Sequence, residues 1–321
     1  MKDRRFVKEL VQNSSIPSFL MLVLLVTINA LLQPNFFSYQ VFRINLMTFT
    51  PLILVSLAQG TVILVGAVDL SLGASISLVT AVMASLMKDS PVSILLVVLL
   101  GMGVAVALSG FNGFFIGVIG PPPLIMTFAT STIWFGVALL LMPHPGGYIP
   151  ETYYSLYSTS ISGFLPVPVV VLIVATLFCL FLGRLRAFRH LYAVGGNEKA
   201  ARASGIKVTR TKIFAFLVSG VFVGLAALCV VAQTATGDAR SGQGFMLNSV
   251  AAAVIGGIAF SGGKGNYAGA AMGGLMLGFL INVIYFANIT SFYQEFMKGV
   301  IIIVALLIGA LPRLRREYLR R

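Results

Sequence analysis

Long apolar runs alternate with short polar interruptions along almost the whole chain of 321 residues. A helix needs roughly 20 apolar residues to cross the hydrocarbon core of a bilayer. Ten runs approach or exceed this length, and we predict a helix in each of them. The predicted spans are 16–33, 45–67, 70–87, 92–119, 123–142, 166–183, 212–233, 247–261, 266–287 and 296–311.

Two places in this pattern differ from a series of simple upright crossings. The second and third runs are almost continuous, because only residues 66–69 interrupt them. The eighth run, 247–261, is too short for a full crossing, and we expect a broken or re-entrant helix there. A membrane tolerates such backbone only where protein or a water-filled cavity covers it.

The composition narrows the class of protein. Apolar residues make up 58% of the chain and charged residues only 10%, with a mean hydropathy of +0.98. Soluble domains carry about 25% charged residues, so the soluble class is excluded. The basic N-terminal segment precedes a long apolar run without a small-residue cleavage site. We therefore predict a retained first helix and no signal peptide.

The formal net charge of +13 lies on one side of the predicted topology. In a soluble protein such a charge would suggest nucleic-acid binding. Ten spans place both termini on one side, and basic loops mark the cytoplasmic side of a membrane protein. We therefore expect no nucleic-acid partner and both termini in the cytoplasm. Of the 22 basic residues, 18 fall on this side: Lys2, Arg4, Arg5, Lys8, Arg184, Arg186, Arg189, Lys199, Arg202, Lys207, Arg210, Lys212, Lys264, Arg313, Arg315, Arg316, Arg320 and Arg321.

A short helix is predicted inside the basic inner segment, at residues 197–204. Asn197 is a favoured N-cap residue, and Gly205 suits the position just after a helix. Glu198 and Arg202 form an i,i+4 pair. Two helical turns are not stable alone in water, so this helix needs the membrane surface or a partner protein. A second large segment, 143–166, is predicted on the outer side.

Signatures of enzymes are missing from the sequence. Residues 261–265 resemble part of a P-loop, but Gly265 stands where Ser or Thr would bind magnesium. The motifs of serine hydrolases and zinc proteases do not occur. We therefore predict no catalytic residue and no metal site. Neither the cysteines nor the histidines suggest a disulfide framework or a metal cluster: Cys179, Cys229, His144 and His190.

Asp69 is the only acidic residue that we place within the apolar stretches. Ionisable residues at membrane depth are costly and mark candidate functional sites. Asp is also a favoured N-cap, and the third predicted helix begins just after Asp69. We predict the structural cap, and a role in proton coupling or solute binding remains the alternative.

Several polar and aromatic residues inside the spans could line a path for a polar solute or hydrogen-bond between helices. Small residues at helical spacing allow close helix packing, and for any one pair we expect this packing to lie within the chain. If a subunit interface uses such residues, the segment from Gly265 to Gly278 is the best candidate. The candidate path residues are Asn45, Gln59, Asn112, Thr127, Trp134, Asn248 and Asn282.

Six motifs in order carry a family resemblance. They are GAVDLSLG at 66–73, SGFNG at 109–113, PPLIMT at 122–127, YAVGGNEKAARASGI at 192–206, AVIGG at 253–257 and SGGKG at 261–265. Together they resemble the ribose/xylose/arabinose type of bacterial ABC transporter permease. The resemblance runs from about residue 16 to 312, and Ala67 replaces a usual glycine.

The resemblance implies an all-α polytopic membrane protein of about ten helices, similar to the vitamin-B12-type importer permeases. It implies one permease domain over 1–321, with a cytoplasmic N-tail 1–15, a coupling loop 184–212 and a cytoplasmic C-tail 312–321. The short inner helix would be the coupling helix for an ATP-binding subunit. Its expected coupling residues are Asn197, Glu198, Ala201, Arg202, Ser204 and Gly205.

The same resemblance implies three kinds of partner. These are cytoplasmic ATP-binding subunits that hold ATP and magnesium, an external solute-binding protein, and a second permease subunit. The chain itself would bind no cofactor and would lie in the bacterial inner membrane. The expected cargo is a monosaccharide-like solute, and related permeases handle nucleosides or autoinducer-2.

The alternative is an ion-coupled secondary transporter that uses Asp69, while an intramembrane enzyme is disfavoured by the few acids and histidines.

Overall fold

The long apolar runs form helices in the computed structural model, which describes residues 15–161, 163–290, 293, 296 and 299–300. Nine of the ten predicted spans correspond to helices, with ends within six residues of the predictions. The tenth, 296–311, lies outside the described residues except at three positions. The nine helices are α2 (Ser15–Leu32), α3 (Tyr39–Leu64), α4 (Leu72–Leu86), α5 (Pro91–Val118), α6 (Pro123–Leu141), α8 (Val167–Arg184), α11 (Val208–Thr234), α12 (Phe245–Ile255) and α13 (Tyr267–Phe286).

Six of these helices are long and apolar enough to cross a membrane: α3, α5, α6, α8, α11 and α13. The short eighth run is confirmed as a short helix, since α12 has only 11 residues. Helix α4 is also short, with 15 residues. Helices α3 and α4 are separated by the non-helical segment 65–71, where the sequence predicted an interruption.

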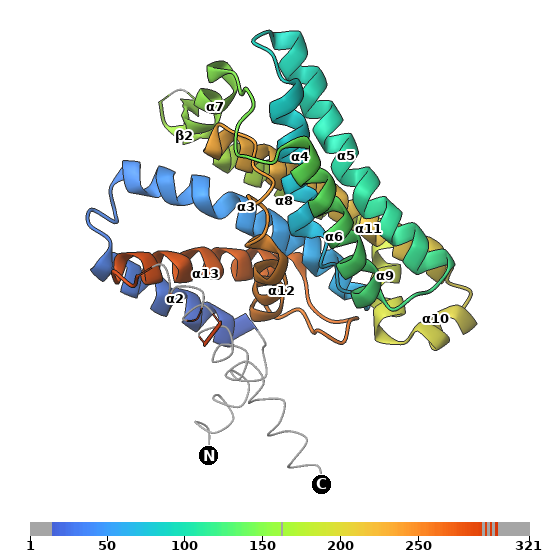
Figure 1. The fold of residues 1–321 in the computed structure, drawn as a ribbon. Coiled ribbons are helices and arrows are strands. Elements are labelled where there is room, and N and C mark those ends of the chain that lie inside the picture. Colours follow the sequence, from blue (N-terminus) through green and yellow to red (C-terminus); the bar gives the residue numbers. More distant parts are fainter. Residues whose placement is uncertain (1–14, 162, 291–292, 294–295, 297–298, 301–321) are drawn as a thin grey trace, which may run out of the picture.

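Helix α3 runs from the edge of the molecule into its centre, where its second half lies together with α11 (Figure 1). In the most apolar window of α3, 83% of the residues are buried, against 17% in α6 and α8. The outer helices therefore expose apolar side chains over much of their length. A bilayer accepts this surface, whereas water would not. Examples with at least 52% exposure are Leu95, Leu96, Leu99, Leu124, Ile125, Phe128, Leu177 and Leu180.

One end of the helix bundle, here called the α7 end, consists of segments 33–38, 87–90, 142–166 and 235–244. Residues 142–166 contain α7 (Glu151–Ser158) and a hairpin of β1 (Ser160–Ile161) and β2 (Leu165–Pro166). The Tyr153 hydroxyl donates to Leu228 O on α11 at 3.0 Å, and the Tyr157 hydroxyl donates to Met47 O on α3 at 2.9 Å. Helix α7 of the predicted outer segment is therefore fixed to the two central helices.

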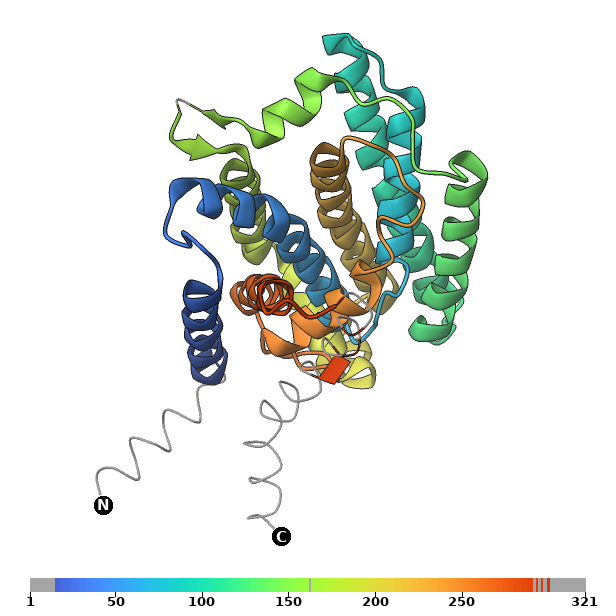
Figure 2. The ribbon, with the colours of Figure 1, turned by 60° about the vertical axis from the view of Figure 1, so that its left-hand side comes forward.

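The opposite end, here called the α10 end, consists of segments 65–71, 119–122, 185–207 and 256–266. Its largest segment folds into α9 (Arg186–Gly196) and α10 (Glu198–Ala203). Helix α8 leads into it and α11 leads out of it, so the two ends lie at opposite ends of these helices (Figures 1 and 2). The order of the segments agrees with the predicted alternation of inner and outer loops.

Candidate functional site

The predicted short helix is present as α10, and side-chain and backbone groups satisfy both of its ends. The Asn197 side chain accepts a hydrogen bond from Ala200 N at 3.0 Å, which is an N-cap contact. At the other end Gly205 has a φ of 80°, and its N–H donates to Arg202 O at 3.0 Å. Ile206 N donates to Ala201 O at 3.1 Å, which completes a Schellman motif.

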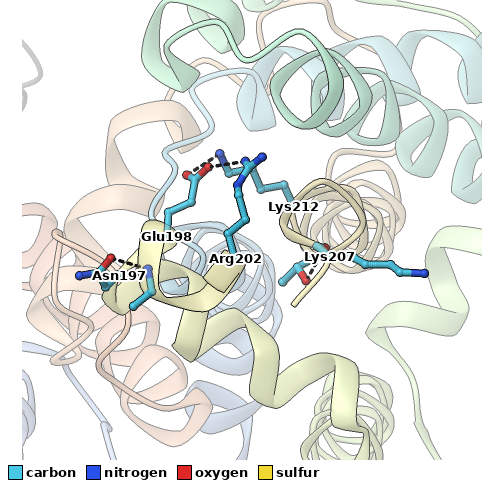
Figure 3. A network of polar contacts seen from close by, with 7 residues as sticks. Asn197, Glu198, Arg202, Lys207 and Lys212 are labelled. Atoms are coloured by element: carbon cyan, nitrogen blue, oxygen red, sulfur yellow. Dashed lines mark hydrogen bonds and ion pairs between the residues drawn. The ribbon is translucent and has the colours of Figure 1, made fainter. Parts of the chain in front are cut away.

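Charged side chains fix α10 against α11. Glu198 accepts from the Lys212 ammonium at 2.9 Å and from the Arg202 guanidinium at 3.4 Å (Figure 3). The hydrogen bond from Lys212 is the main reason why the pKa of the Glu198 carboxyl is lowered. The sequence predicted the pair within the helix, but not the link to Lys212, because fourteen residues separate the two positions.

The other predicted coupling residues divide into buried and exposed groups. Ala201 is 5% exposed and packs in the main core, whereas Ser204 is an exposed C-cap residue. A cavity of about 580 Å³ opens beside the helix. Glu198, Lys199, Arg202 and Ala203 line it. Helix α10 thus has one face held by the protein and one charged face available to another surface.

Helix α9 is a part of this site that the sequence interpretation did not identify. Its packed face carries Phe188, Leu191 and Val194, all buried. Their i,i+3 spacing was the available signal, because it is typical of an amphipathic helix. The Phe188 ring stacks on Tyr267 with a centroid distance of 4.9 Å, and the Tyr267 hydroxyl lies 2.9 Å from the Thr61 hydroxyl. Helix α9 is therefore tied to α13 and α3.

Two of the candidate path residues belong to a hydrogen-bonded amide cluster near the α7 end. Asn282 on α13 donates to the Asn45 side-chain oxygen on α3 at 2.9 Å. Asn45 in turn donates to Gln33, just after α2, at 3.2 Å. Asn45 is 8% exposed. These amides join three helices, as the interhelical alternative predicted.

A second polar cluster surrounds the break between α3 and α4. The Gln59 amide lies beside the Asp69 backbone, and in the orientation that pairs both of its groups it donates to Asp69 O at 2.9 Å and accepts from Asp69 N at 3.3 Å. The Asp69 carboxylate accepts from Ser71 N at 2.8 Å and from the Ser71 hydroxyl at 2.6 Å. Asn112 on α5 donates to the Ser71 hydroxyl oxygen at 2.8 Å. Thr127 on α6 accepts from Leu70 N at 3.1 Å. The break is thus held by side chains from three neighbouring helices.

Asp69 does not occupy the N-cap position that we predicted. That position belongs to Ser71, which makes no side-chain capping bond, and α4 begins at Leu72. Asp69 instead stabilises the turn that leads into the helix. Among the described residues, its second carboxylate oxygen has no hydrogen-bond partner, and neither does the amide oxygen of Asn112.

The last two candidate path residues stand apart from both clusters. Trp134 on α6 meets Phe111 on α5 edge to face, with a centroid distance of 5.6 Å. Asn248 lies half-buried on α12. The seven candidates therefore do not form one continuous polar lining within the part of the chain that the structure describes.

Two glycines of the 265–278 segment pack inside the chain, as we expected for any one pair, and a subunit interface at this segment stays a prediction. A methyl group on Gly273 would lie 1.9 Å from Ala252 O, and one on Gly274 would lie 2.6 Å from the Cα of Ile53. These glycines allow α13 to approach α12 and α3 of the same subunit. Their small size is explained by intramolecular packing.

The charges of the described residues are distributed unequally between the two ends. The α7 end and its adjoining helix ends carry three basic and three acidic residues: Arg43, Lys88, Arg240, Asp89, Glu151 and Asp238. The α10 end and its adjoining helix ends carry two acids, Asp69 and Glu198, and nine basic residues. These basic residues are Arg184, Arg186, Arg189, Lys199, Arg202, Lys207, Arg210, Lys212 and Lys264. No group of metal-binding side chains is found among the described residues.

Comparison with known proteins gives a consistent family. The family described as branched-chain amino acid transport system / permease component matches residues 43–306. The ribose import permease protein RbsC of Haemophilus influenzae is 31% identical over 299 residues, covering 90% of this chain and 91% of the relative. The D-allose transport system permease protein AlsC of Escherichia coli is 32% identical over 304 residues, covering 92% and 91%.

A further relative is named for a different solute. The autoinducer 2 import system permease protein LsrC of an Enterobacter species is 28% identical over 322 residues, covering 98% of this chain and 91% of the relative. No solved structure matches this chain. The expected likeness to the vitamin-B12-type importer fold therefore stays a prediction.

Proposed function

The chain belongs to the branched-chain amino acid transport system / permease component family, and we propose that it is the permease subunit of an ATP-driven importer for a monosaccharide-like solute. The named relatives support a sugar or a sugar-like cargo. We propose one permease domain over residues 1–321, including the tails 1–15 and 312–321, which fall outside the described residues except for Ser15.

The observation that carries this proposal is the geometry of α10. It is a two-turn helix capped at both ends, tied to α11 by Glu198 and Lys212, and charged on its free face. The caps and the ion pair would hold this short surface helix in place when a partner protein exerts force on it. We propose that this partner is a cytoplasmic ATP-binding subunit holding ATP and magnesium. An external solute-binding protein and a second permease subunit complete the proposed assembly.

The mechanism follows from these parts. ATP binding would draw two ATP-binding subunits together and move the α10 helices of two permease subunits. That rigid displacement would shift the equilibrium toward an outward-open path, and hydrolysis would restore the inward-open state. The chain itself performs no chemical step.

The direct test is co-purification followed by reconstitution. An affinity-tagged chain should bring down its ATP-binding subunit from cells that express both. In vesicles, Glu198→Ala with Arg202→Ala should lose the stimulation of ATPase activity by the loaded binding protein while membrane insertion is unchanged. Arg189→Ala with Lys207→Ala is a control for the loss of exposed charge in the same loop, because these basic residues make no ion pair with α10. Normal stimulation in the α10 double variant would overturn the coupling role.

The alternative, an ion-coupled secondary transporter, depends on Asp69. The unpartnered carboxylate oxygen of this buried residue is the feature that favours it. An amide at this position still offers one oxygen to Ser71. We therefore expect Asp69→Asn to keep ATP-driven uptake of D-ribose, D-allose or autoinducer-2, whichever the wild type carries. Uptake that needs an ion gradient, needs no ATP and disappears in Asp69→Asn would establish the alternative.

A further inference from the structure

Three chain segments that are far apart in sequence meet through their backbones at the α10 end. Gly263 N donates to Leu64 O, the carbonyl of the last residue of α3, at 3.0 Å. Gly195, in the last turn of α9, lies against both groups. A methyl group on Gly195 would stand 2.0 Å from Leu64 O and 2.7 Å from Gly263 N. The end of α9 therefore rests on a hydrogen bond between α3 and the 256–266 segment.

Neighbouring glycines extend this contact, here called the backbone junction of residues 64–66, 195–196 and 262–263. A methyl group on Gly262 would lie 2.9 Å from Gly195 O and 2.9 Å from the Cα of Gly66. One on Gly263 would lie 2.5 Å from Gly196 N. Gly66, Gly262 and Gly263 have φ values of 85°, 84° and 69°, which favour glycine.

A backbone junction transmits displacement differently from a side-chain contact. A side chain can absorb a shift by changing its rotamer, whereas the glycines at this junction have no side chain that could do so. Helix α10 follows α9 after a single residue, Asn197, and its Glu198 is linked to Lys212. A displacement of α10 would therefore act on the end of α9, and through it on the junction.

The backbone junction includes residues of two non-helical segments, 65–71 and 256–266, here called the irregular segments. On one side, Leu64 is followed by the 65–71 break, whose Asp69 is bonded to Gln59 on α3. On the other side, the 256–266 segment connects α12 to α13. Its own backbone is closed by a bond from Ala259 N to Lys264 O at 2.9 Å. Movement at the junction would thus act on α4 and α12, the two short helices that follow or precede these segments.

We propose that Gly195 is a positioning residue that passes displacement of α10 to the two irregular segments, 65–71 and 256–266. This inference rests on the proposed function, because it needs an ATP-binding partner to move α10. It predicts that the two segments respond to nucleotide only while the junction keeps its close backbone packing.

The test uses the complete complex and two adjacent glycines. Gly195→Ala inserts a methyl group into the junction, whereas Gly196→Ala inserts one where no atom lies within 4 Å. Hydrogen–deuterium exchange is compared without nucleotide and after trapping with ATP and vanadate. In the wild type and in Gly196→Ala, exchange should change in α10, in 65–71 and in 256–266. In Gly195→Ala the change in α10 should persist while the changes in both irregular segments are lost.

A second pair approaches the junction from the opposite segment, in case Gly195→Ala does not fold. Asn tolerates positive φ, so Gly263→Asn tests the crowding at Gly196 N. Gly257→Asn is its control, with a φ of 95° and no atom within 4 Å of the added carbon. Gly263→Asn should lose the response of 65–71 and 256–266, and Gly257→Asn should keep it.

The possible outcomes separate this inference from the proposed function. If no ATP-binding subunit co-purifies, or α10 ignores nucleotide in the wild type, the proposed function fails. If α10 responds but the two irregular segments of the wild type do not, the inference fails alone. It also fails if Gly195→Ala or Gly263→Asn, once folded and assembled, responds like its control. If both test variants fail to assemble while the wild-type segments respond to nucleotide, the junction is needed for assembly, and the positioning role is overturned.

Discussion

At the scale of single residues, Asn197 and Gly205 decide where α10 begins and ends. A helix leaves four N–H groups and four carbonyl groups without partners at its two ends. In a helix of six residues nearly all backbone groups belong to one end or the other. The capping bond from Ala200 N to Asn197 and the turn at Gly205 therefore matter more here than they would in a long membrane span.

Loss of the Asn197 side chain should loosen α10 without affecting the rest of the fold. Replacing an N-cap Asn by Ala costs typically about 1 kcal/mol. We expect Asn197→Ala to raise amide exchange across residues 198–203 several-fold, while exchange in α3 and α11 is unchanged. Asn197→Asp keeps the acceptor oxygen and should behave like the wild type. Equal exchange in Asn197→Ala and Asn197→Asp would show that the cap is unimportant.

The link between Glu198 and Lys212 should depend on pH in a defined direction. The pKa of the Glu198 carboxyl is lowered below its ordinary value, chiefly by its hydrogen bond from Lys212. A carboxyl with a lowered folded-state pKa stabilises the fold above its unfolded pKa and loses this effect as pH falls through the folded pKa.

We therefore expect the protection of α10, corrected for intrinsic exchange, to be constant from about pH 7 to pH 5 and to fall under more acidic conditions. Because Glu198 is partly exposed, the effect should stay below about 1 kcal/mol. Glu198→Gln should show lower protection at neutral pH and no further loss from this site in acid. A midpoint near neutral pH in the wild type would contradict the assignment to Glu198.

At the scale of helices, packing depends on glycines that meet the backbone of a neighbouring helix. Gly273 on α13 faces Ala252 O on α12, and Gly274 faces the Cα of Ile53 on α3. Any larger residue would force these helices apart. These glycines belong to one repeated spacing in the sequence, but in the structure they pack against two different helices.

A substitution at Gly273 tests whether this glycine is needed for close helix packing, as distinct from its effect on helix propensity. Gly273→Ala should lower the thermal stability in detergent, because crowding in a packed core costs about 1–3 kcal/mol. Gly103→Ala on α5 is the control, since no atom lies within 4 Å of the added methyl group. That change should be neutral or stabilising by up to about 1 kcal/mol, as Ala is the better helix former. A similar melting temperature for both variants would contradict the packing argument.

Sequence reasoning succeeded at this scale where the signal was local. Apolar run length located the spans, and Asn197 and Gly205 located α10, because caps and runs are read within a few residues. It did not identify the link from Glu198 to Lys212, which amides pair with Asn45, or the backbone junction at Gly195. Each of these joins positions whose proximity is set by helix packing, and no local pattern carries that information.

At the scale of the whole molecule, charge and surface polarity distinguish the two ends from the sides. The outer helices expose apolar side chains, and the α10 end collects nine basic residues against two acids. Basic residues are retained on the cytoplasmic side of bacterial membrane proteins. The α10 end should therefore face the cytoplasm, where ATP is available. The α7 end, with α7 and the hairpin, should face the external solute-binding protein.

This orientation can be measured with single cysteines. Phe164 at the α7 end is 80% exposed, and Ser204 at the α10 end is exposed as well. In a transport-active background with Cys179→Ser and Cys229→Ala, a membrane-impermeant maleimide should label Phe164→Cys in intact spheroplasts. It should label Ser204→Cys only after permeabilisation. The reverse pattern would place α10 outside and exclude coupling to cytoplasmic ATP. Protection of Ser204→Cys by a co-expressed ATP-binding subunit would further place that subunit at α10, since this cysteine lies at the end of the proposed coupling helix.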